Sequence, residues 1–249
     1  MKINFTKEDK DRVIKKFDKI KYLREFVKSG KIKYKKMAQD DLKHIIELDL
    51  RISRGMFMKI SPILKVDHDE IGEILHYSMS LDRKYARSIT VDSLWNICRN
   101  EMMDRKGLEY NYILDIPNIE NIAEQNLKRR ADSLSNDFYK KNDGVPVLSG
   151  WLDLDALIRR IDQDLSTAGV RYFADRDTIP KVLYCLETDS WAGGTSRRIK
   201  IMCLYYIQGR YDDILDIVST WDKKNAAIME LRFADGIKKK IEQDRQSNK

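Results

Sequence analysis

The chain is poor in the residues that usually interrupt or cross-link a fold. Its 249 residues include 11 glycines, 4 prolines and 3 cysteines. Scarce glycine and proline exclude a fold built from many short strands and tight turns, and they favour helices. Cys98, Cys185 and Cys203 are odd in number and widely spaced within apolar periodic segments. This pattern excludes a disulfide framework and indicates buried thiols that stay reduced.

Long apolar runs are also missing. The densest run, residues 201–207, is far shorter than the roughly 20 apolar residues of a membrane-spanning helix. Residues 1–9 contain no apolar core of the kind that a signal peptide needs. We therefore expect a soluble, cytoplasmic protein that has no membrane partner.

No complete catalytic or nucleotide-binding motif is present. No Ser/His/Asp or Cys/His order of the kind that activates a nucleophile can be recognised. Carboxylate pairs such as Asp162 and Asp164 are two residues apart on a predicted helix, so they diverge instead of converging on one substrate atom. We expect no catalytic role.

The three histidines give no convincing metal site. Asp41/His44 and Glu73/His76 have the three-residue spacing of half a di-iron carboxylate site. On a helical projection, however, His44, Glu73 and His76 lie away from the apolar stripe and should face water. His68 lies in an acidic cluster at the start of a predicted helix, where a structural role is expected. We expect neither a metal nor a cofactor.

What the chain has in excess is charge, and it is arranged in blocks. Residues 1–36 carry 14 Lys or Arg against 5 Asp or Glu. The excess of positive charge in this block alone is larger than the formal net charge of the whole chain, +7. Residues 37–222 carry 25 against 31, and residues 223–249 carry 8 against 4. A mildly acidic body with two basic ends creates local fields that favour oppositely charged partners.

Apolar residues recur every three or four positions along most of the chain, which predicts helices. Ten segments follow this period: 6–29, 33–53, 70–81, 91–102, 117–138, 151–166, 179–188, 196–208, 211–221 and 224–243. Helices joined by short turns pack as antiparallel neighbours. The predicted fold class is all-α, an irregular bundle of about ten helices packed as antiparallel hairpins.

Two segments depart from the helical period. Residues 110–116 alternate imperfectly and are the best strand candidate, but a single strand has nothing to pair with, so we interpret them as an extended linker. Residues 142–146, Asn-Asp-Gly-Val-Pro, are the strongest loop signal. We expect a single all-α domain over residues 1–249, with any sub-domain boundary near residues 142–148.

A short segment near the C-terminus resembles a tetratricopeptide-type helical hairpin. Residues 209–214, Gly-Arg-Tyr-Asp-Asp-Ile, follow Leu-Tyr-Tyr at 204–206 and match the turn and second helix of that motif. Ile214 stands where that family favours Ala, and no second copy recurs at a period near 34 residues. The resemblance implies a helical hairpin that is part of an irregular bundle, not a repeat array.

A glycine-rich segment is the candidate anion site. Two glycines leave backbone amides open, Thr195 or Ser196 can cap the next helix, and two arginines stand just inside it. This arrangement suits a phosphate or carboxylate, although an ordinary capped turn between helices has the same residues. The candidate residues are Gly193, Gly194, Thr195, Ser196, Arg197 and Arg198.

The basic N-terminal block is the candidate nucleic-acid site. Its lysines can neutralise phosphates, and Tyr34 among them can stack on a base. A solvated helix face would look the same. The candidate residues are Lys28, Lys31, Lys33, Lys35 and Lys36.

The absence of catalytic order and the predicted helical hairpins favour a cytoplasmic, non-catalytic protein that binds one protein partner. A neutraliser of a toxin or effector (an immunity-type protein) and an adaptor are both compatible with such a fold. Trp151 and Trp191 are candidate interface anchors, although each could equally belong to the core. The alternatives are a nucleic-acid-binding protein that uses the basic N-terminus and an enzyme that holds phosphate in the Gly193–Arg198 loop.

Overall fold

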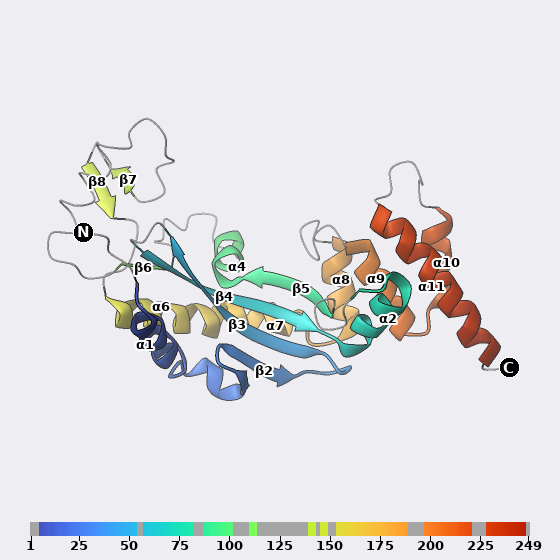
Figure 1. Cartoon of the computed structure of the whole chain (residues 1–249), viewed down its shortest axis with the longest axis horizontal. Helices are drawn as coiled ribbons and strands as arrows, with labels where there is room; N and C mark the ends of the chain where they lie inside the picture. Colours follow the sequence, from blue (N-terminus) through green and yellow to red (C-terminus); the bar gives the residue numbers. More distant parts are fainter. Residues whose placement is uncertain are drawn as a thin grey trace. The chain divides into compact units, whose positions relative to one another are not determined.

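The computed structural model describes residues 5–53, 57–81, 87–101, 110–113, 139–142, 145–148, 153–188, 197–220 and 228–247. These residues form a mixed α/β fold with an antiparallel sheet (Figure 1). The elements in chain order are α1 (Lys7–Phe17), the 3-10 helix η1 (Tyr22–Glu25), β1 (Val27–Gly30), β2 (Lys33–Met37), β3 (Lys43–Ser53), β4 (Phe57–Asp67), α2 (Asp69–Met79), β5 (Ser88–Ser93), α4 (Leu94–Glu101), β6 (Asn111–Ile113), β7 (Tyr139–Asn142), β8 (Val145–Leu148), α6 (Leu154–Asp164), the π-helix η2 (Leu165–Gly169), α7 (Val170–Ala174), α8 (Ile179–Thr188), α9 (Arg197–Ile207), α10 (Tyr211–Ser219) and α11 (Ile228–Ser247).

The main sheet has the strand order β1-β2-β3-β4-β5, so strands that are consecutive in the chain are neighbours (Figure 1). The sixth strand, β6, pairs antiparallel with the start of β4, and Tyr112 lies opposite Met58. Strand β1 stands at one end of this order and β5 at the other. A separate two-stranded sheet pairs β7 with β8, and Asn142 lies opposite Val145.

The all-α prediction is wrong, because residues 33–53 contain two strands, β2 and β3, instead of one helix. Residues 46–52 read Ile-Glu-Leu-Asp-Leu-Arg-Ile and alternate strictly between apolar and polar, which is the period of a half-buried strand. Ile46 and Leu48 are fully buried, whereas Arg51 is exposed. The helical interpretation instead joined Ile45, Leu48 and Ile52, which are three and four residues apart.

Strand β4 carries the same alternation, since Met58, Ile60, Leu64 and Val66 are fully buried. The sequence interpretation treated Pro62 as a break, because proline lacks the amide that a strand ladder uses. In the structure Pro62 is a buried residue within β4. Together with β3, this strand forms the centre of the sheet.

Three other segments differ from their predicted form. The helix predicted over residues 6–29 ends at Phe17 and is followed by η1 and β1, and the helix predicted over 91–102 is divided between β5 and α4. The predicted linker contains strand β6, because β4 supplies the pairing partner that the sequence alone did not reveal.

The remaining helical predictions are confirmed, apart from small shifts at their ends. Predicted helices over 70–81, 151–166, 179–188, 196–208, 211–221 and 224–243 correspond to α2, α6, α8, α9, α10 and α11. Between α9 and α10, Gly209 adopts the left-handed backbone conformation with φ of 70°, which glycine accepts without steric cost. The helix predicted over 117–138 lies outside the described residues.

The chain divides into two compact units, each described here by itself. The first comprises residues 1–34, 47–63 and 93–170, and the second comprises 35–46, 64–92 and 171–249, so the boundaries fall within β2, β3, β4, β5 and α7. The core of the first unit includes Phe17, Leu48, Met58, Ile60 and Leu157. The core of the second includes Ile71, Leu186, Met202, Phe233 and Ile237. A single domain with a boundary near 142–148 stays a prediction.

In the second unit, α2 and α11 pack closely at Gly236. A Cβ atom at this position would lie 2.4 Å from the carbonyl oxygen of Ser78 and 2.6 Å from its Cα. These are backbone atoms of α2, so they can give way only if the helix shifts. The close contact of the two helices therefore requires glycine at this position.

Replacing Gly236 by Ala should destabilise the protein, although alanine has the better helix propensity. We expect a loss of about 1–3 kcal/mol in the free energy of unfolding, because the added methyl group overpacks the contact with Ser78. Urea unfolding measures this loss of stability, and Asp235→Ala, at the exposed neighbouring position, is the control. Equal stability of Gly236→Ala and the wild type would contradict the packing described.

Candidate functional site

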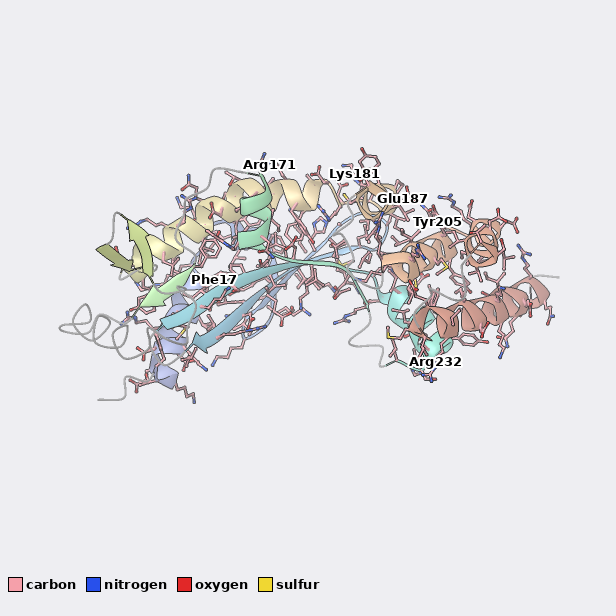
Figure 2. All side chains as sticks on the ribbon, turned by 90° about the horizontal axis from the view of Figure 1, so that it is seen from above. Phe17, Arg171, Lys181, Glu187, Tyr205 and Arg232 are labelled. Atoms are coloured by element: carbon pink, nitrogen blue, oxygen red, sulfur yellow. The ribbon has the colours of Figure 1, made fainter. Side chains whose placement is uncertain are left out.

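The basic N-terminal block is built on helix α1 and the β-hairpin of β1 and β2. Helix α1 begins with a capping box, in which Thr6 accepts a hydrogen bond from the Asp9 amide and Asp9 accepts one from the Thr6 amide at 2.8 Å. Its buried face carries Val13, Ile14 and Phe17, and the Phe17 ring (labelled in Figure 2) lies 5.9 Å from the Tyr34 ring of β2. Apolar packing thus places α1 beside the strand.

Two aspartates of this segment hold the hairpin lysines. Asp18, the C-cap of α1, accepts from Lys28 of β1 at 2.5 Å and also accepts from the Tyr34 hydroxyl. Asp11, one heptad earlier and therefore on the same face of α1, accepts from Lys31 at 2.8 Å in the turn between β1 and β2. The lysines nearest the hairpin turn are therefore already neutralised within the chain.

These contacts shift the titration of the groups involved. Burial, and then the hydrogen bond to Asp18, raise the pKa of Tyr34, so its hydroxyl remains a donor throughout the physiological range. The hydrogen bond from Lys31 lowers the pKa of Asp11, which keeps this carboxylate charged. The hairpin is held by one neutral hydroxyl and two ion pairs.

Three of the cations that remain without a counter-ion lie in the segment that leads into β1. Lys19, Lys21 and Arg24 are exposed, and none of them has a side-chain hydrogen bond or ion pair among the residues that the structure describes. We call these three residues together with β1 the basic edge surface. The lysines predicted from the sequence lie further along the chain, because the density of charge is highest there and the counter-ions cannot be read from the sequence.

The predicted nucleic-acid residues take different positions. Lys28 and Lys31 form the ion pairs described above. Lys33, Lys35 and Lys36 lie on β2, where Lys33 and Lys35 are half-buried and Lys36 is exposed. They follow one another on a strand instead of lining one face of a helix. Their part in nucleic-acid binding stays a prediction.

The predicted anion loop is described only at its end. Gly193, Gly194, Thr195 and Ser196 lie outside the described residues, as do Trp151 and Trp191. Arg197, at the start of α9, donates from Nε to the carbonyl oxygen of Leu186 and from Nη2 to that of Glu187 at 2.6 Å. Tyr205 donates to the Glu187 carboxylate at 2.8 Å, and Figure 2 labels both residues. Arg197 therefore caps the C-terminal end of α8, while Arg198 is exposed.

A buried polar cluster of the first unit surrounds Asp164, at the point where α6 passes into the π-helix η2. This carboxylate is 2% exposed and accepts from the Tyr110 hydroxyl at 2.5 Å and from Arg160 Nε at 3.1 Å. Burial and the hydrogen bond to Asp164 raise the pKa of Tyr110. Because Tyr110 and Asp164 are both buried, the cluster is not open to a substrate, and its role is structural. Arg160 lies four residues before Asp164, a helical spacing that could have predicted this pair.

A second polar cluster lies at the junction of β4 and α2 in the second unit. Asp67 is buried and accepts from Ser88 at 2.6 Å, and Arg87 Nε lies 3.3 Å from it. Asp69 pairs with Lys43 and lies 3.7 Å from Arg87. The acidic cluster that the sequence showed around residue 68 is thus compensated by Lys43 of β3 and by Arg87, which directly precedes β5.

The thiol of Cys203 is unsuited to nucleophilic chemistry. Cys203 is fully buried, and desolvation raises its pKa, so the reactive thiolate is disfavoured. Within the described ranges, no group of three or more His, Cys, Asp or Glu could hold a metal ion. In the same ranges, no helix is both long enough and apolar enough to cross a membrane.

The histidine predictions hold in part. His76 and Glu73 are exposed as predicted, and His68 has the structural role that was expected, because its Nδ1 accepts from the Glu70 amide and caps α2. The prediction for His44 is wrong: it lies on β3, is 6% exposed and stacks on Phe173 at 4.4 Å between ring centroids. On β3 the His44 side chain points toward Phe173, whereas on a helix it would have pointed toward water.

Comparison with known proteins gives no relative for this chain: no protein-family model, no curated protein and no solved structure matches it.

Substitution of Asp164 should cost stability. Asp164→Ala leaves the Tyr110 hydroxyl and the Arg160 guanidinium without their buried acceptor, and we expect a loss of about 2–4 kcal/mol in the free energy of unfolding. Gln163→Ala, an exposed neighbour on the same helix, is the control and should change it by less than about 0.5 kcal/mol. Chemical unfolding of both variants measures the difference. A loss no larger than that of the control would show that the cluster contributes nothing.

His44 should make the protein less stable in mild acid. Burial lowers the pKa of His44 in the folded state, whereas in the unfolded chain it titrates near its ordinary value of about 6.5. Between these two values the unfolded state binds the extra proton, so stability is present at neutral pH and falls as pH decreases. Thermal unfolding at about pH 7.5 and about pH 5.5 should show a smaller drop for His44→Phe than for the wild type. An identical drop in both proteins would rule out His44 as the source.

Proposed function

We propose that this chain is a non-catalytic binding protein that engages one protein partner through the basic edge surface. The observation that carries the proposal is the contrast between neighbouring cations: Lys28 and Lys31 are paired with aspartates, whereas Lys19, Lys21 and Arg24 are exposed without a counter-ion in the described part of the chain. Exposed charges of one sign steer an oppositely charged partner into contact. The partner surface is therefore acidic.

The surface is also held in a defined shape, which supports a binding role. Asp11 and Asp18 attach the hairpin to α1, and the buried Phe17 ring of α1 packs against the Tyr34 ring of β2. A preorganised surface loses less conformational entropy when a partner binds. The narrower form of this proposal is an immunity-type or adaptor function in the cytoplasm. Its only support is analogy with other small proteins that bind a single partner.

Nucleic-acid binding is the second candidate, and the same exposed cations favour it. The ion pairs of Lys28 and Lys31 count against it, because two of the five predicted phosphate-binding lysines would have to give up an aspartate partner. An acidic protein surface can meet Lys19, Lys21 and Arg24 without disturbing those pairs. We therefore place the protein partner first.

Charge reversal at the basic edge surface should abolish partner capture. The tagged wild type, Lys21→Glu/Arg24→Glu and the control Arg232→Glu/Lys239→Glu are purified from native cells with and without nuclease. Arg232, labelled in Figure 2, and Lys239 are exposed cations of α11, so the control carries the same change of charge. We expect one protein, retained after nuclease by the wild type and the control and lost from Lys21→Glu/Arg24→Glu, identified by mass spectrometry.

Two results would contradict the proposal. Loss of everything after nuclease treatment would establish the nucleic-acid candidate instead. Retention of the same protein by Lys21→Glu/Arg24→Glu would show that the basic edge surface is not the interface.

A further inference from the structure

Strand β1 is an open edge of the main sheet. It lies at the end of the strand order, and all four of its residues are exposed. No described strand pairs with its outer side. An edge strand of this kind offers amide and carbonyl groups that another chain can pair with, and many peptide-binding proteins use such an edge to add a strand.

The usual protection of an edge strand is neutralised in β1. Natural proteins place charged side chains, above all lysine, on edge strands, and these prevent another chain from pairing there. The lysine of β1, Lys28, is held by Asp18 at 2.5 Å, so it adds no uncompensated charge to the edge. Val27 is 73% exposed and offers an apolar side chain beside the backbone. A partner strand therefore meets a lysine whose charge is already balanced by Asp18.

The charge beside β1 indicates what kind of strand fits. Lys21 and Arg24 lie in the segment that enters β1, six and three residues before Val27, and both are exposed. A strand that pairs with β1 and continues past Val27 would bring its side chains to this segment. Carboxylates on that strand would meet cations that have no described partner.

The opposite edge of the sheet differs from β1 in its burial. In strand β5, Ile89 and Thr90 are buried, Ser88, Asp92 and Ser93 are half-buried, and Val91 is the exposed apolar residue. The cation directly before it, Arg87, is already paired with Asp67 and Asp69. Val91 therefore offers a reference position on the other edge strand.

We propose that β1 is a docking strand, and that its occupant is an extended, acidic segment of a partner protein that pairs with β1 as an added strand. This inference rests on the proposed function and specifies how that partner is bound. The backbone of β1 supplies the pairing, Val27 supplies an apolar contact, and Lys21 and Arg24 select for Asp and Glu in the segment.

The test uses the full-length protein and synthetic probes, with binding measured by fluorescence anisotropy. The main probe is a labelled ten-residue peptide of alternating Thr and Glu, and its partner probe has the same sequence with every second amide N-methylated. N-methylation keeps the charge and removes the hydrogen-bond donors on one side of the strand. We expect the methylated peptide to bind at least about tenfold more weakly.

Variants of the protein complete the test. Val27→Asp and Lys21→Glu/Arg24→Glu should each weaken binding of the acidic peptide at least about tenfold, whereas Val91→Asp and Arg232→Glu/Lys239→Glu should leave it unchanged. Because Val27 and Val91 are both exposed, neither substitution disturbs the core. Equal binding of the methylated and unmethylated peptides would overturn strand addition, and tighter binding of a single-stranded oligonucleotide of equal length would overturn the acidic-protein assignment.

The remaining outcomes separate the inference from the function on which it rests. If β1 instead pairs with a second copy of the chain, the wild type will sediment as a dimer and Val27→Asp as a monomer, which overturns the inference. If the acidic peptide fails to bind while the native partner is still captured in a way that depends on Lys21 and Arg24, strand addition is wrong and the proposed function stands.

Discussion

The arrangement of the N-terminal region depends on two carboxylates of its first helix. Asp11 lies on α1 and binds Lys31 of the following hairpin. Asp18 is the C-cap of α1 and binds Lys28. Without these contacts, the hairpin would carry a run of like charges beside a basic helix, and β1 would have little besides its pairing with β2 to hold it. The two aspartates therefore add to the apolar packing that places the hairpin, and they determine which of its lysines are already paired.

The same principle separates structural from functional polar groups elsewhere in the chain. Asp164, Asp67 and His44 are buried and each has partners within its own unit, so they stabilise and define a unique packing. Arg197, the arginine that sequence analysis assigned to an anion, is engaged with the carbonyl oxygens at the end of α8. Residues whose polar groups are satisfied internally are poor candidates for binding, and Lys19, Lys21 and Arg24 are among the exposed cations that this criterion leaves.

The C-terminal helices could be predicted from the sequence because each carries a long apolar stripe with clear ends, as α8 does over 179–188. The sheet could not, since Leu48 and Ile52 are four residues apart, a spacing that fits one face of a helix as well as one face of a strand. The choice depends on neighbouring strands that the local sequence does not reveal. Pro62 misled the analysis further, because β4 accommodates a proline in a central strand. The block of positive charge was visible in the sequence, whereas the ion pairs that divide it are long-range contacts and became visible only in the structure.

Hydrogen exchange of the amides over residues 27–37 tests the central claim, that aspartates of α1 hold a basic β-hairpin in place. In the wild type the amides paired between β1 and β2 should exchange slowly, and in Asp18→Ala they should exchange faster, with those of α2 unchanged as an internal reference. The variant loses the acceptor for both Lys28 and Tyr34, so the loss of protection should be confined to the hairpin. Equal exchange in the two proteins would contradict the account, because the hairpin would then be held by something other than Asp18.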